Sequence, residues 1–247
     1  PWDLRLAPDV LTAGDGPADE GSRAFVAHAL ALHAAHAAPR ANRLRQQAIH
    51  NDANDYNVLV GGGADAYTRR QRVVGLLDFG DMVWSALVHE VAVAAAYALL
   101  GQDDPLAAIA TVASGYHEVL PLEEDEIAVL FPLVLLRLAL SVHHAASQTS
   151  ARPDDPYLAI SQAPIRAAMT ALQAIQPRLA HYTLRHACGL EPVPHAPALV
   201  AWLRAHQQEF APVVASLCAN LPKVKTWICI DGDAPQVPQA RSLQAWI

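Results

Sequence analysis

Lysine and aromatic residues are scarce in this chain of 247 residues. The only lysines are Lys223 and Lys225, and aromatic residues make up 6% of the chain. Hydrophobic residues make up 53% and are mostly Ala, Leu and Val, a composition that favours packed helices over sheets. We find no apolar run of the length needed to cross a bilayer and no leader pattern at the amino end, so we expect neither a membrane protein nor a secreted one.

Positive charge is also scarce, and the formal net charge is −7. An acidic surface repels a nucleic-acid backbone, whereas it attracts a cationic amine. The three cysteines, Cys188, Cys218 and Cys229, are widely spaced and include no C-x-x-C pair, which is typical of reduced thiols in a cytoplasmic protein. We therefore predict a cytoplasmic protein with no nucleic-acid partner and no membrane partner.

Acidic and amide side chains occur in the order typical of a phosphoryl-transfer site. His50, Asp52 and Asn57 form an H-x-D-x-x-x-x-N pattern, and an apolar segment then ends in Asp78-Phe79-Gly80. Phosphoryl transfer needs a carboxylate for the acceptor hydroxyl and oxygen ligands for the Mg²⁺ that bridges the ATP phosphates. We predict that Asp52 is the catalytic base and that Asn57 and Asp78 hold Mg²⁺ with ATP. His50 is expected to be a structural loop residue, because Asp52 already fills the role of the base.

A β-hairpin is expected to bring the two metal ligands together. Asn57 opens a short apolar strand that ends at Val60, and the glycines 61–63 interrupt it. Residues 72–77 form an apolar segment of matching length, which we expect to pair with the first strand. This pairing would deliver Asp78 beside Asn57.

Two segments resemble a known protein family. They are residues 50–60, HNDANDYNVLV, and residues 75–82, GLLDFGDM. They resemble the aminoglycoside phosphotransferase and choline kinase family of the protein-kinase-like fold, and within it the hydroxylysine-kinase-like branch. The resemblance implies that Asp52 is the base, that Asn57 and Asp78 bind Mg²⁺, and that His50, Gly80 and Glu90 support the site, Glu90 from a helix beneath the catalytic loop.

One position departs from the pattern of that family. The family most often has Gly where Asn51 stands. Asn tolerates left-handed backbone angles better than most residues, so we expect Asn51 to adopt the conformation that the glycine would have.

The sequence lacks the residues with which such kinases bind the nucleotide. No lysine precedes the catalytic loop to clamp the phosphates, and Asp19 stands where the glycine-rich segment 14–21 would need its third glycine. We interpret that segment as a solvated acidic loop. The predicted fold is therefore mainly α (α+β), the helical C-terminal lobe of a protein-kinase-like fold with a small catalytic hairpin. We expect its N-terminal nucleotide lobe to be missing and this chain alone to be inactive.

Apolar periodicity predicts a succession of helices after an entry segment at residues 2–11. The expected helices span 21–45, with a break at Pro39 as the alternative, 87–100, 106–120, 123–147, 157–175 and 198–210, and residues 177–190 continue the resemblance to the late C-terminal lobe of the family. Asp104 is the expected N-cap of the helix that Pro105 begins. We assign residues 1–220 to the kinase lobe and 221–247 to a tail or linker, since members of this branch are sometimes fused to further enzyme domains; a surface strand at the end of the chain is the alternative.

Two functions remain open from the sequence alone. The first is an ATP- and Mg²⁺-dependent kinase that phosphorylates a hydroxyl of a small cationic amine or amino alcohol. The second is a non-catalytic module derived from a kinase and kept for binding or assembly. Asp52, Asn57 and Asp78 favour the kinase, whereas the missing nucleotide clamp favours the module and leaves an apolar surface that would promote self-association.

Overall fold

The computed structural model describes residues 2–13, 16–61, 72–151, 162–206, 208–209, 212, 227–229 and 240–242. The chain forms two compact units, Pro1–Pro192 and Val193–Ile247. The second unit contains helix α9 (Ala196–Ala205) and a parallel pair of short strands, β5 (Trp227–Cys229) and β6 (Ala240–Ser242). The predicted boundary between residues 220 and 221 lies outside the described residues.

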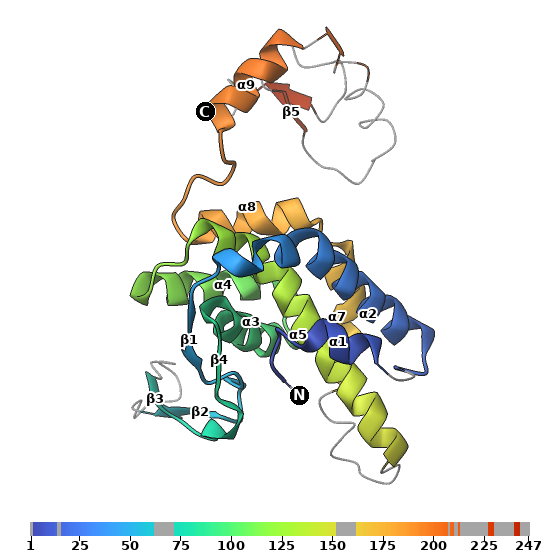
Figure 1. The fold of residues 1–247 in the computed structure, drawn as a ribbon. Coiled ribbons are helices and arrows are strands. Elements are labelled where there is room, and N and C mark those ends of the chain that lie inside the picture. Colours follow the sequence, from blue (N-terminus) through green and yellow to red (C-terminus); the bar gives the residue numbers. More distant parts are fainter. Residues whose placement is uncertain are drawn as a thin grey trace. The chain divides into compact units, whose positions relative to one another are not determined.

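Helix α5 (Glu124–Ala151) runs through the core of the first unit (Figure 1). It packs against α3 (Leu87–Ala98), α2 (Glu20–Leu32) and α8 (Pro177–Ala187), and its side chains from residue 127 to 140 are almost all buried. Three acidic residues in its first turn face the positive end of the helix dipole. A single apolar helix thus forms the centre around which the other helices pack.

By length and composition, helix α5 is able to cross a membrane, which corrects the expectation that no apolar run reaches that length. The part of the helix with this length and composition is Glu124–Gln148, and its apolar stretch is mostly buried inside the protein. Length and composition do not distinguish a buried core helix from a membrane span, because both are apolar nearly all round.

Most of the predicted helices of the first unit are confirmed. They are α3, α4 (Pro105–Val119) and α5, together with α7 (Gln162–Ala174), whose expected first residues lie outside the described part; α8 lies in the segment 177–190, for which no helix was predicted. Asp104 Oδ1 accepts the backbone N–H of Ala107 at 3.0 Å, so the predicted N-cap is also confirmed.

The first predicted helix, 21–45, is α-helical only to Leu32, and the alternative of a break at Pro39 agrees with the 3₁₀ helix that begins at Ala38. Helix α2 begins at Glu20, where the Asp19 side chain caps it by accepting the N–H of Ser22 at 2.8 Å, so Asp19 is a cap and not only a loop residue. After Leu32 the chain forms a π-turn, η1 (His33–Ala37), and a 3₁₀ helix, η2 (Ala38–Arg43). Pro39 has no N–H and its ring crowds the preceding turn, which explains why the α-helical ladder does not continue.

Two antiparallel strand pairs lie on one side of the helical unit (Figure 1). The predicted hairpin is confirmed as β2 (Val58–Gly61) paired with β3 (Arg72–Leu76), with Val58 opposite Leu76. A second pair, β1 (Gln46–Ile49) with β4 (Val83–Ala86), was not predicted. Ile49 lies opposite Val83, so the catalytic loop leaves β1 at the end where the Asp78 segment enters β4.

The first residues of the chain are held against β4 and α3 by a buried polar network. Ser85 Oγ donates to Asp3 Oδ1 at 3.2 Å and lies 2.9 Å from His89 Nδ1. Burial lowers the pKa of His89 to about 4, so His89 is neutral at neutral pH. This network fixes the backbone next to Trp2, whose ring lies over the Arg137 guanidinium of α5 at 4.4 Å.

Candidate active site

His50 joins the catalytic loop to the Asp78 loop. It is buried directly after β1, and its Nδ1 accepts the backbone N–H of Asp52 at 3.3 Å. The proton of the neutral ring is then on Nε2, which donates to the carbonyl oxygen of Leu77 at 2.7 Å. The ring also contacts the Phe79 ring edge-on, with 5.0 Å between centroids. Both nitrogens are engaged with the backbone, which leaves neither free for proton transfer.

The Asp52 carboxylate is held on both oxygens. Oδ1 accepts from Arg137 Nη2 at 3.1 Å, and Oδ2 accepts from Asn57 Nδ2 at 2.8 Å. Burial raises the pKa of Asp52 above its ordinary value, while the positive charge of Arg137 opposes that rise. The side chain keeps 19% of its surface exposed, so an oxygen of an incoming ligand can reach it. A positioned carboxylate with a raised pKa is suited to accept a proton.

Asn57 and Asp78 lie at the same end of the β2–β3 hairpin. The backbone N–H of Leu77 donates to the Asn57 carbonyl at 2.9 Å, which continues the pairing of Val58 with Leu76 by one residue. Asp78 follows immediately, in a left-handed conformation with φ +57°. Its Oδ1 accepts the N–H of Gly80 at 3.3 Å, so a turn of three residues orients the carboxylate.

The oxygen atoms that Asn57 and Asp78 offer fit a magnesium ion. Asn57 donates through Nδ2 to the carbonyl and the carboxylate of Asp52, which leaves the amide Oδ1 as its ligand atom. Asp78 is exposed and offers carboxylate oxygens. Among the described residues no three His, Cys, Asp or Glu side chains form a metal cluster. Mg²⁺ bound with nucleotide phosphates needs only one or two protein carboxylates, so an amide and a carboxylate fit it.

Gly80 leaves room for the Asp78 carboxylate. A Cβ added at Gly80 would lie 3.2 Å from Asp78 Oδ1, closer than an ordinary contact. Any other residue at this position would require the carboxylate to shift by a few tenths of an ångström. The predicted supporting role of Gly80 thus has a steric reason.

Asn51 and Glu90 hold the catalytic loop from below. Asn51 is buried and has φ +67°, the left-handed conformation in which Asn substitutes for Gly with little strain. Its backbone N–H donates to Glu90 Oε2 at 2.9 Å, from the first turn of α3. The helix therefore fixes the loop one residue before Asp52.

Removing the Glu90 carboxylate should destabilise the fold. In Glu90→Ala the buried N–H of Asn51 loses its acceptor, at a cost of about 1–3 kcal/mol in the free energy of unfolding. Glu90→Gln keeps an acceptor oxygen at the same place and should recover most of that loss. Urea unfolding measured by circular dichroism compares the three proteins. Equal stability of Glu90→Ala and the wild type would show that the contact does not hold the loop.

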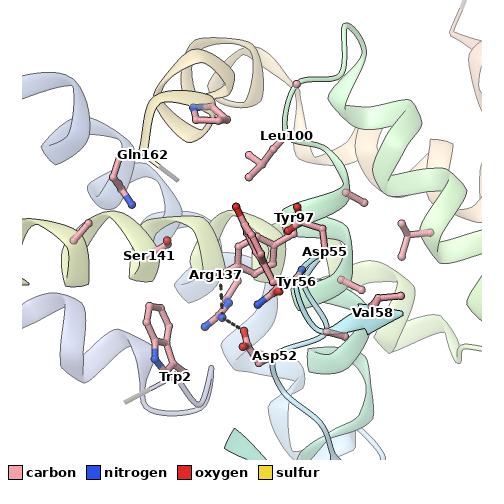
Figure 2. Close-up of a pocket in the computed structure, with 18 of the residues that line it drawn as sticks. Trp2, Asp52, Asp55, Tyr56, Val58, Tyr97, Leu100, Arg137, Ser141 and Gln162 are labelled. Carbon is pink, nitrogen blue, oxygen red and sulfur yellow. Dashed lines mark hydrogen bonds and ion pairs between the residues drawn. The ribbon is translucent and has the colours of Figure 1, made fainter. Parts of the chain in front are cut away.

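A cavity of about 910 Å³ opens above the catalytic loop (Figure 2). Its polar wall includes Asp52, Asp55 and Arg137, and its apolar wall includes Leu100 and Val112 from the α3–α4 region. The acidic residues 123–126 do not line it. The cavity is large enough for a small organic molecule in contact with the Asp52 carboxylate.

Three residues of this site were missed by the sequence analysis: Trp2, Tyr97 and Arg137. Arg137 is 1% exposed and is the basic residue within the apolar run of α5 from 127 to 140. Such a charge inside a buried helix is rarely without a partner, and that was the signal available in the sequence. Trp2 and Tyr97 carried no comparable signal, because only the fold brings them to α5.

The comparisons with known proteins agree with this geometry. The phosphotransferase enzyme family matches residues 1–128. Hydroxylysine kinase of Xenopus laevis is 32% identical over 126 residues, which is 50% of this chain and 34% of the relative. Hydroxylysine kinase of Mus musculus is 28% identical over 162 residues, 65% of this chain and 43% of the relative. No solved structure matches at a significant level.

The chain thus spans less than half of the length of the curated relatives it matches. The predicted resemblance to the hydroxylysine-kinase-like branch is confirmed by these relatives. The family match covers just over half of the chain and includes the catalytic loop, the hairpin with Asp78, and α3 with Glu90. On that match, the chain belongs to the phosphotransferase enzyme family.

Proposed function

We propose that this chain is the catalytic helical lobe of an ATP- and Mg²⁺-dependent kinase that phosphorylates a hydroxyl of a small amine or amino alcohol. The observation that carries the proposal is the Asp52 carboxylate, held between Asn57 and Arg137 at the wall of a cavity. Asn57 and Asp78 lie at the end of the hairpin beside it, where they would hold the metal.

In the proposed reaction Asp52 orients the acceptor hydroxyl and takes its proton. The hydroxyl oxygen forms a bond to the γ-phosphorus of ATP while the bond from that phosphorus to the bridging oxygen breaks, and ADP leaves. Bound Mg²⁺ would neutralise phosphate charge. The raised pKa of Asp52 makes its carboxylate a stronger base than an exposed one, which supports this role.

A cationic acceptor is supported by the acidic side chains that line the cavity, Asp52 and Asp55. The acids at the start of α5 are used elsewhere: Asp125 pairs with Arg43 at 2.6 Å, and Glu126 pairs with Arg45 at 2.5 Å. None of the acids at residues 123–126 lines the cavity, and the side chains of Glu123 and Glu124 are more than half exposed. Asp125 and Glu126 are engaged in ion pairs outside the cavity. The proposed attraction for an amine therefore depends on Asp52 and Asp55.

We propose that the part of the full-length protein that binds the nucleotide covers exposed apolar residues on the hairpin and on the segment after it. The exposed apolar side chains of the hairpin and of the segment after it are Leu59, Val60, Val73, Val74, Leu76, Leu77, Phe79, Met82 and Trp84. An apolar patch of this kind marks an interaction surface. It is the surface that a nucleotide lobe of the full-length protein would cover, and it also supports the proposed self-association of this chain by itself.

The direct test is phosphoryl transfer by the protein at its full natural length. With Mg²⁺ and ATP, we expect ADP formation together with a phosphorylated acceptor, detected by mass spectrometry. Hydroxylysine is the first acceptor to test, because the relatives are named for it. EDTA should abolish the transfer. Calorimetry should show only weak ATP binding to residues 1–247 alone; tight binding would contradict the proposal that a further lobe is needed to hold the nucleotide.

The non-catalytic alternative makes the opposite prediction. A binding module would take up the amine without any phosphorylated product, whatever the Mg²⁺ concentration. Absence of product across a panel of hydroxyl-bearing amines, from protein that binds them, would therefore overturn the kinase proposal.

A further inference from the structure

Arg137 carries more hydrogen-bond donors than its partners use. Its Nη2 donates to Asp52 Oδ1 and to the Tyr97 hydroxyl, both at 3.1 Å. Its Nε and Nη1 are buried and have no hydrogen-bond partner in the described part of the chain. A guanidinium has five N–H bonds, of which Nη2 holds two, so roughly three remain without an acceptor.

Two aromatic rings hold the guanidinium in place. The Trp2 ring centroid lies 4.4 Å from the central guanidinium carbon, and the Tyr97 ring centroid lies 5.5 Å from it. Cation–π contacts of this kind stabilise the charge and restrict the side chain (Figure 2). Arg137 is therefore positioned before any ligand binds, at the wall of the cavity that contains Asp52.

If Arg137 served only to hold Asp52, it would not need further buried N–H groups that lack an acceptor. One hydrogen bond already joins the two side chains, and buried N–H groups of a cation are unfavourable without an acceptor. An acceptor that enters the cavity would remove this penalty. The ligand group that guanidinium N–H bonds match best is a carboxylate or a phosphate, and the nearby Asp52 and Asp55 disfavour the more highly charged of the two.

We propose that Arg137 recognises a carboxylate on the acceptor molecule, through the N–H groups of Nε and Nη1. This inference rests on the proposed function, since it places the acceptor in this cavity with its hydroxyl at Asp52. Asp55, exposed at the cavity, is then the partner for the ammonium group. The acceptor class is a hydroxyl-bearing amino acid, bound at three points. Nε and Nη1 are covered in this structure, so binding has to shift the Trp2 or the Arg137 side chain.

The test compares two acceptors that differ only in the carboxyl group. They are hydroxylysine and the diaminopentanol that remains when its carboxyl group is removed. In the full-length protein, Arg137→Met should lower kcat/KM for hydroxylysine by roughly ten- to a hundredfold, mainly through KM. For the diaminopentanol the loss should be smaller and should appear in kcat alone, because Arg137 also holds Asp52, so the ratio of the two kcat/KM values should fall by roughly tenfold. Arg137→Lys should recover part of the loss, and Arg43→Met, which removes an arginine from an exposed ion pair, is the matched control.

An equal loss for both acceptors in Arg137→Met would overturn the inference, because a residue that only positions Asp52 affects every acceptor alike. Binding measured without ATP separates this result from the proposed function. By calorimetry, hydroxylysine should bind the wild type more tightly than the diaminopentanol, and Arg137→Met should remove the difference. Tryptophan fluorescence should change on binding and lose that change in Trp2→Phe.

The two proposals can fail independently. Carboxylate-dependent binding without phosphoryl transfer would contradict the kinase and leave the Arg137 inference standing. Phosphoryl transfer to both acceptors with equal efficiency in the wild type would support the kinase and contradict the role of Arg137.

Discussion

Asp52→Asn should lower turnover in the full-length protein by on the order of a hundredfold or more, the usual effect of losing a general base. The KM for the acceptor should change little, because Asp52 is proposed to act mainly in the transition state. An asparagine at this position keeps one oxygen that can accept from Arg137 and places an NH2 group where Oδ2 accepts from Asn57, but Asn57 Nδ2 still donates to the backbone carbonyl of residue 52. Circular dichroism and Mg²⁺ binding should therefore remain close to those of the wild type.

Asp55→Asn is the contrasting variant, since Asp55 lines the same cavity but is proposed only to bind the amine. It should raise KM and leave kcat nearly unchanged. The pH profile of the wild type provides a second check. A base acts when deprotonated, and the pKa of Asp52 is raised, so kcat should fall on acidification at a higher pH than for an ordinary aspartate. Near-normal turnover of Asp52→Asn would show that Asp52 is not the base.

Asp78→Asn should reduce activity by more than about a hundredfold, because the metal that neutralises the phosphates contributes several kcal/mol to the transition state. Asn tolerates the left-handed backbone of residue 78 and can still accept the N–H of Gly80. The variant thus removes one charge without disturbing the turn. An excess of Mg²⁺ should restore a trace of activity, measured as ADP release over a Mg²⁺ titration.

Asp81→Asn is the matched control, because Asp81 lies in the same turn and is not proposed as a ligand. Its dependence on Mg²⁺ should match that of the wild type. Equal activity of Asp78→Asn and the wild type at low Mg²⁺ would remove Asp78 from the proposed metal site. Asp78→Ala is less informative, since Ala in a left-handed conformation adds strain of about 1–2 kcal/mol.

The local features of the site could be predicted from the sequence. The spacing of Asp52, Asn57 and Asp78, the hairpin between them and the capping by Asp104 all depend on residues near one another in the chain. The left-handed conformation of Asn51 also follows from its residue type and its place in the pattern. The roles proposed for Asp52, Asn57 and Asp78 stay predictions that the variants above would test.

The errors of the sequence analysis occurred where long-range packing overrides local pattern. Strand β1 is short and partly exposed, and it forms because β4, far along the chain, supplies its hydrogen bonds. Helix α5 is as apolar as a membrane span, and its burial depends on the helices around it.

The sequence by itself determined the family, the catalytic loop and the hairpin, because these depend on side chains and turns within short segments. Only the tertiary structure decided what surrounds Asp52. Arg137 from α5, Tyr97 from α3 and Trp2 from the amino end meet there across long stretches of chain. The local conformational preferences of residues do not predict such contacts, because the position of each helix depends on the apolar surface of all the others. The cavity proposed for the acceptor is therefore a property of the packed helices, whereas the proposed catalytic residues belong to a local motif.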